Sequence, residues 1–217
     1  MGARTMLAAV VGGLVGAVGA VVAQRSPVLN LAGDRFKPLT YEQLTPEQKT
    51  LVDHILSGPR ASLGGPFNVL LRSPELGDLA QQLGAYVRFR SSLPRRLNEM
   101  AILMVARAWT AQYEWYVHKR AALQAGLSPA IVEAIAAGRR PESMSPQEAA
   151  VYDFCRELME SKEVSDPTFA AAVAAFGERG VVDLIGVAGY YHLVSMLLNV
   201  DRYPLPPGAV PELKPLR

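Results

Sequence analysis

At several points between residues 45 and 167, this chain places a serine, threonine or aspartate directly before a proline. These pairs are Thr45-Pro46, Ser73-Pro74, Ser128-Pro129, Ser145-Pro146 and Asp166-Pro167. The first side chain can accept a free backbone N–H of a new helix, and proline lacks the N–H that would have no partner there. Thr45 with Gln48, and Ser145 with Glu148, complete capping boxes. The pattern predicts a chain of helices with well-defined starts.

Helix ends and apolar spacing support the same fold class. Glycine marks predicted ends at Gly58-Pro59, Gly126, Gly138 and Gly177. Between these signals, apolar residues recur with helical spacing, as in Leu76, Leu79, Leu83 and Val87. No segment alternates in the manner of a strand bounded by hairpin turns. We therefore predict an all-α domain of about seven helices over residues 37–203.

Two of the predicted helical stretches are unusual, one in its length and one in its apolar character. After Pro94, residues 95–125 contain neither glycine nor proline and would make a very long single helix. We therefore predict a break near Trp109-Thr110, with Thr110 as the N-cap of a helix that begins at Ala111. The last predicted helix, residues 181–200, is apolar on most sides. It is expected to lie between neighbouring helices or at a subunit interface.

Composition excludes several classes of protein. The 217 residues carry 22 Lys plus Arg against 20 Asp plus Glu, a net charge of +2, which gives no electrostatic footprint for nucleic acid. The single cysteine, Cys155, excludes an internal disulfide framework, a thiolate-rich zinc site and a two-cysteine redox centre within one chain.

The ends of the chain have a different character. Residues 6–23 hold no charged side chain and follow a short basic start, so residues 1–23 are predicted to be a signal peptide cleaved after Ala23, or a retained membrane anchor. The domain would then be exported or membrane-attached, and cytoplasmic only if the start codon is misassigned. Residues 24–36 are predicted to be a linker. The proline-rich tail, residues 204–217, is expected to run over the surface or to reach a neighbouring molecule.

Glu114 and His118 are the strongest candidates for chemistry. They lie four residues apart, so their side chains share one face of a helix. A carboxylate beside an imidazole orients the ring and raises its pKa, which suits a general acid or base. The same spacing also occurs in solvated helix pairs and around core histidines. No spacing in the chain matches a di-iron or zinc-protease site, and no metal is expected.

Other side chains can serve such a site as substrate-binding residues. Arg95 or Arg96 can bind a substrate carboxylate, although both also suit a solvated helix start. Aromatic residues near the pair can form a wall that excludes water. The full set of candidate binding residues is Arg95, Arg96, Trp109, Tyr113, Trp115, Tyr190 and His192.

Part of the chain resembles a known family. The run Leu97-Asn98-Glu99-Met100-Ala101-Ile102-Leu103, then Tyr113-Glu114-Trp115-Tyr116-Val117-His118 and Ala125-Gly126-Leu127-Ser128, is similar to the carboxymuconolactone decarboxylase family, which includes the alkyl hydroperoxidase D group. The resemblance implies an all-helical, alkyl hydroperoxidase D-like domain that assembles as trimers or hexamers. It also implies that Glu99 and His118 hold proton-relay positions.

The resemblance leaves the reaction open. In the hydroperoxidase branch, two cysteines stand where this chain has Ala111 and Glu114, which disfavours thiol-based antioxidant activity here. The remaining interpretation is a cofactor-free, decarboxylase-like lyase that acts on a small carboxylated or lactone substrate through Glu99, Glu114 and His118. The alternatives are the antioxidant and a non-catalytic oligomeric binding or scaffold protein.

Overall fold

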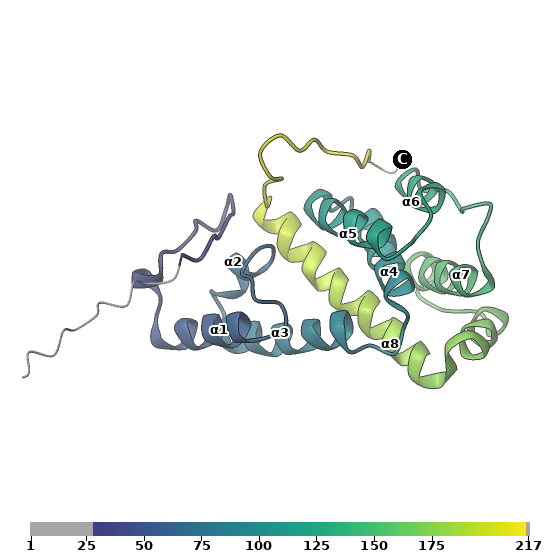
Figure 1. Ribbon diagram of the computed structural model, residues 1–217, viewed down its shortest axis with the longest axis horizontal. Helices are drawn as coiled ribbons and strands as arrows, with labels where there is room; N and C mark the ends of the chain where they lie inside the picture. Colours follow the sequence, from purple (N-terminus) through teal and green to yellow (C-terminus); the bar gives the residue numbers. More distant parts are fainter. Residues whose placement is uncertain (1–27, 216–217) are drawn as a thin grey trace, which may run out of the picture.

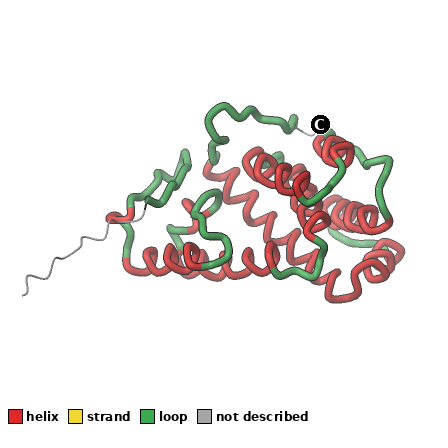
Figure 2. Tube along the Cα trace, viewed as in Figure 1, coloured by secondary structure: helices red, strands yellow, loops and turns green. Residues whose placement is uncertain are grey.

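Helices form the regular structure of this protein (Figures 1 and 2). The computed structural model describes residues 28–215, and no strand occurs within that range. The predicted all-α class is therefore confirmed. After a 3₁₀ turn at Tyr41–Gln43, the α-helices are α1 (Pro46–Ser57), α2 (Phe67–Leu70), α3 (Pro74–Phe89), α4 (Arg95–Ala108), α5 (Gln112–Gln124), α6 (Pro129–Ala136), α7 (Pro146–Ser161) and α8 (Asp166–Asp201).

The predicted helix starts are found close to their expected positions. Thr45 and Ser145 accept the backbone N–H groups of their capping-box partners at the starts of α1 and α7. Ser73 and Ser128 precede α3 and α6 but make no side-chain cap hydrogen bond. At the start of α8 the cap position belongs to Ser165, one residue earlier than predicted. Proline at the first turn is thus the more constant signal, because its φ angle already suits a helix.

The predicted break between α4 and α5 is confirmed. Thr110 adopts a left-handed backbone conformation with φ 49°, which a continuous helix cannot contain. The cap of α5 is Ala111 rather than Thr110, so the helix begins one residue later than predicted. The turn folds α5 back against α4. Residues that a single continuous helix would keep far apart therefore come close together.

Helix α4 lies at the centre of the fold. It packs against α5, α6, α7 and α8, and most of its side chains are buried. The surrounding core is one large apolar cluster, while a second cluster joins α1, α2 and α3. Helix α3 contacts both α1 and α8 and so connects the two clusters.

Helix α8 combines two predicted helices, one that begins near Asp166-Pro167 and the last one over residues 181–200, with a break between them. Gly177 has φ 67° and ψ 171°, so the helix changes course at the glycine predicted as an end signal. By length and composition, α8 is apolar enough to cross a membrane, but 56% of its most apolar window is buried inside the structure. That burial is the behaviour of a core helix. The predicted signal peptide or anchor, residues 1–23, lies outside the described residues.

Both flanking segments pack onto the helices. From the predicted linker, Leu29 is buried and the Phe36 N–H donates to Asp201 at 2.8 Å. The C-terminal segment arches back from α8 toward α6 (Figure 1). Its Leu213 is 4% exposed and joins the main core, and Gln112 hydrogen-bonds the backbone of Leu213.

Candidate active site

His118 lies between two carboxylates contributed by two helices. Its Nδ1 atom is 2.6 Å from Oε2 of Glu99 on α4, and its Nε2 atom is 3.0 Å from Oε1 of Glu114 on α5. The Glu114 contact is the one that helical spacing predicts, while the Glu99 contact depends on the packing of α5 against α4. All three side chains are at most 5% exposed. Charges in so dry a place interact strongly.

The two carboxylates control the protonation of the imidazole. Burial by itself lowers the pKa of His118, but the charges and contacts of Glu114 and Glu99 outweigh burial and raise the pKa above its ordinary value. When Nδ1 donates to Glu99, a neutral ring would turn the lone pair of Nε2 toward the Glu114 carboxylate. A proton on Nε2 removes that repulsion, so the buried ring favours its charged form.

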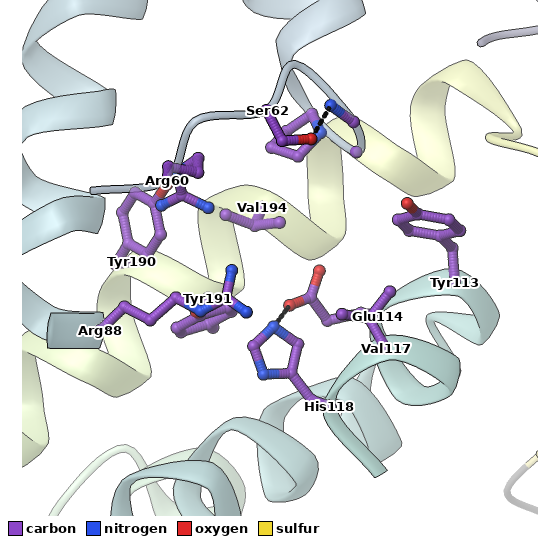
Figure 3. Close-up of a pocket in the computed structure, with 13 residues that line it drawn as sticks. Arg60, Ser62, Arg88, Tyr113, Glu114, Val117, His118, Tyr190, Tyr191 and Val194 are labelled. Atoms are coloured by element: carbon purple, nitrogen blue, oxygen red, sulfur yellow. Dashed lines mark hydrogen bonds and ion pairs between the residues drawn. The ribbon is translucent and has the colours of Figure 1, made fainter. Parts of the chain in front are cut away.

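A cavity of about 280 Å³ opens beside this trio (Figure 3). Glu114 and His118 form one wall, while Tyr190, Tyr191 and Val194 of α8 form another. Tyr113 and Val117 of α5 also line the cavity, and α3 contributes Arg88. The rest of the lining comes from the loop between α1 and α2, with Arg60, Ser62, Gly64, Gly65 and Pro66. Glu99 lies behind His118 and does not line this cavity.

The α8 tyrosines present hydroxyl groups without partners. The hydroxyls of Tyr190 and Tyr191 are buried and make no hydrogen bond to the described residues. Burial raises the pKa of both phenols, so both remain protonated donors near neutral pH. The Tyr191 ring packs edge-on against His118, with ring centroids 5.0 Å apart. A bound molecule with acceptor oxygens would satisfy these donors.

Two arginines that line the cavity carry no sequence signal that predicts them. Arg60 follows the Gly58-Pro59 break, and Arg88 lies near the end of α3. Neither position carries a local motif, because only the packing of α1, α3 and α8 brings them to the cavity of His118. The arginines predicted to bind a substrate carboxylate, Arg95 and Arg96, lie just before Glu99 in the chain instead.

The structure separates those two predicted arginines. Arg95 lines a different cavity of about 250 Å³, together with Glu99 and Arg88. Arg96 forms an ion pair with Glu148 of α7 and lines neither cavity. Arg96 thus connects two helices rather than facing His118.

Only some of the predicted aromatic and histidine residues line the cavity of His118. Tyr113 and Tyr190 line the cavity. Trp115 is buried on another side of α5, where its indole N–H donates to Glu212 at 3.4 Å. Trp109 packs edge-on against His192, with ring centroids 6.0 Å apart, and neither residue lines the cavity.

The structure also places the residues that bear on redox and metal chemistry. Ala111 caps α5, and Glu114 contacts His118, where the hydroperoxidase branch would carry cysteines. Cys155 is buried in α7, and burial raises the pKa of its thiol to about 12. Within residues 28–215, no group of three or more His, Cys, Asp or Glu side chains is arranged to hold a metal ion.

Comparison with known proteins supports the predicted resemblance. Residues 74–157, which include Glu99, Glu114 and His118, match the model of the carboxymuconolactone decarboxylase family. A crystal structure from Agrobacterium tumefaciens, of a protein of unknown function and candidate antioxidant defence protein AhpD, is similar with a TM-score of 0.57 and 19% identity. The similarity covers 65% of this chain and 99% of that one, and it shows a shared fold. A comparison with curated proteins gave no match.

Proposed function

We propose that the protein, whose residues 74–157 match the model of the carboxymuconolactone decarboxylase family, is a cofactor-free acid–base enzyme for a small carboxylated or lactone substrate. The observation that carries this proposal is the position of His118. Its ring lies between two buried carboxylates at the wall of a cavity. A raised pKa at such a wall suits a group that donates a proton to a reacting carbon and recovers it afterwards.

Each member of the trio has a distinct role in this proposal. Glu99 accepts the Nδ1–H hydrogen bond and so orients the ring from outside the cavity. Glu114 faces the cavity beside Nε2 and favours the charged imidazole. His118 transfers the proton. The hydroxyl of Tyr191, beside the ring, is placed to donate to an oxygen that becomes negative during the reaction.

A decarboxylation fits these roles with its atoms balanced. The bond between the carboxylate and its neighbouring carbon breaks, and carbon dioxide leaves. The electron pair passes into the enolate of an adjacent carbonyl group, whose oxygen accepts from Tyr191. The carbon then takes the Nε2 proton of His118, and solvent returns a proton to the ring. A lactone or β-keto acid contains the carbonyl group that these reaction steps require.

The test compares the full chain with a His118→Gln variant of equal thermal stability. Both are incubated with a metabolite extract supplemented with lactones and β-keto acids, and mass spectrometry follows depletion. Loss of a general acid or base is expected to slow turnover by about 10²–10⁴-fold. His192→Gln is the matched control, because His192 lies outside the cavity and hydrogen-bonds Ala188 of its own helix. Equal depletion by parent and His118→Gln would contradict the proposal.

We also propose that copies of this chain associate, as the resemblance implies. Helix α3 exposes Leu76, Leu79 and Leu83 on one stripe, and α8 exposes Val182 and Ile185. Exposed apolar stripes of this kind are typical of subunit contacts. Light scattering after size-exclusion chromatography measures the number of subunits, and a strictly monomeric protein would contradict this expectation.

A further inference from the structure

Arg60 carries buried donor atoms on its guanidinium group. Its Nε and Nη2 atoms, like the hydroxyl of Tyr190, form no well-aligned hydrogen bond with a described residue. Arg60 and Tyr190 are close enough that the guanidinium acts to lower the pKa of the phenol, against the larger effect of burial. Arg60 belongs to the loop between α1 and α2, and Tyr190 belongs to α8. Both residues line the cavity of His118 (Figure 3). Unsatisfied buried donors are costly, so this part of the cavity is built for a ligand that brings acceptors.

The position of these two groups is supported by the residues around them. The Arg60 guanidinium lies over the Phe67 ring, 5.1 Å from its centroid. On the other side is Gly84 of α3, where a Cβ atom would come within 2.8 Å of Arg60 Nη2 and closer still to the Tyr190 hydroxyl. The absence of a side chain at Gly84 therefore leaves the space that Arg60 and Tyr190 occupy.

The charges of the cavity are divided between its walls. Arg60 and Arg88 supply two guanidinium groups, and neither is within ion-pair distance of a carboxylate among the described residues. The carboxylate that lines the cavity, Glu114, is already in contact with His118. An anionic group that enters would thus meet two guanidinium groups, that of Arg60 and that of Arg88, neither of which forms an ion pair within the described residues. Guanidinium groups bind carboxylates through paired hydrogen bonds.

We propose that Arg60, supported by Tyr190, is the residue that makes this site specific for anionic substrates by binding a carboxylate group. The inference rests on the proposed function for the opposite wall. It assigns specificity to parts of the chain outside residues 74–157, since Arg60 precedes that range and Tyr190 follows it. A small monocarboxylate would place its charged end at Arg60 and its reactive carbon toward His118.

Binding of matched acid and neutral probes tests this assignment. The probes are levulinate with its methyl ester, and 2-furoate with 2-furamide, titrated into the full chain and followed by calorimetry and ligand-observed NMR. The acids are expected to bind more tightly than their neutral counterparts. Arg60→Gln is expected to weaken acid binding by about tenfold or more and to leave the neutral probes unaffected, because a hydrogen-bonded charge pair is lost. Arg60→Lys should recover part of the preference.

Arg139→Gln serves as the control for net charge, because Arg139 is exposed and lines a separate surface cavity. The assignment is overturned if the parent binds acids and neutral probes equally or binds none of them. It is also overturned if Arg60→Gln weakens both probe types alike, as a general structural defect would. His118→Gln separates the two proposals: retained acid binding without turnover supports both, whereas Arg60-dependent binding with unchanged turnover removes only the proposed function.

Discussion

The Nδ1 atom of His118 lies 2.6 Å from Oε2 of Glu99, a carboxylate nineteen residues earlier in the chain and on the neighbouring helix. The contact exists because Thr110 interrupts the helical path and α5 returns along α4. It fixes which ring nitrogen faces inward and leaves Nε2 for Glu114 and the cavity. A local turn between α4 and α5 is therefore what orients the proposed proton donor.

Replacement of either carboxylate is expected to lower the pKa of His118. Glu114→Gln should lower it most, because the charge of Glu114 is the largest of the influences that raise it, and Glu99→Gln should lower it less. Proton NMR titration can follow the imidazoles, since the chain has only 3 histidines. The resonance of His192, whose pKa is lowered by burial, should not move. An unchanged His118 titration in both variants would show that the carboxylates do not govern the ring.

The same pKa shift predicts how stability depends on pH. The folded-state pKa of His118 is raised above the ordinary value of 6.5. Below pH 6.5 the ring is protonated in both the folded and unfolded states, so its stabilising contribution is fully present. As pH rises through the folded-state pKa, this contribution is lost. Denaturant unfolding can measure the free energy of unfolding of the parent and of His118→Gln at a series of pH values. As pH increases, the stability of the parent relative to the variant should therefore decrease.

Local signals in the sequence predicted the helices well. Thr45, Ser145 and the first-turn prolines act within one helical turn, so their effects can be recognised without tertiary information. The break near Thr110 was recognisable for the same reason. The boundaries differ by a residue at Ala111 and Ser165, because the final cap depends on how the flanking chain packs.

The site was predicted only in part. Glu114 and His118 share a helix and were paired by spacing, while Glu99 came from the family resemblance. Arg60 and Arg88 could not be found, because tertiary packing alone brings a loop before α2 and the end of α3 to the same cavity. Arg96 illustrates the converse, since its place near Glu99 in the sequence gives no indication of its Glu148 partner.

Removal of the Leu213 side chain is expected to destabilise the protein. Leu213 is buried in the main core although it belongs to the tail, and Arg107 donates to the neighbouring Lys214 carbonyl at 2.6 Å. Leu213→Ala should lower the free energy of unfolding by about 2 kcal/mol, at the low end for buried leucine because the tail can adjust. Val210→Ala is the control, since Val210 is 72% exposed and should change little. Equal effects of the two substitutions would mean that the tail is not anchored through Leu213.

Cys155 is expected to be inert in the native protein. Its side chain is fully buried, and burial raises the pKa of the thiol to about 12, so almost no thiolate forms near neutral pH. An aromatic disulfide reagent, which forms a mixed disulfide with free thiols, should react with the unfolded chain and only negligibly with the folded one. Dithiol-dependent reduction of peroxides should be absent for both the parent and Cys155→Ala. Rapid labelling of the folded chain, or peroxide reduction lost in Cys155→Ala, would restore the antioxidant hypothesis.

Gly84→Ala is expected to displace Arg60 and Tyr190 from their present positions. Alanine favours a helix interior by about 1 kcal/mol over glycine, while its Cβ atom would occupy space now filled by Arg60 Nη2 and the Tyr190 hydroxyl. The Arg60 guanidinium is the end of a flexible side chain and can move aside, but the Cβ atom would also overlap the Cζ ring atom of Tyr190, which is buried in the main core. The free energy of unfolding should therefore fall by about 1–3 kcal/mol, since displacement of a packed ring outweighs the gain in propensity. Levulinate affinity should fall with that displacement, as in Arg60→Gln.

Gly189→Ala provides the comparison, because nothing lies within 4 Å of a Cβ atom at that exposed position of α8. It should gain helix stability and bind levulinate like the parent, and a Gly84→Ala variant that also binds like the parent would show that Gly84 does not hold the arginine in place.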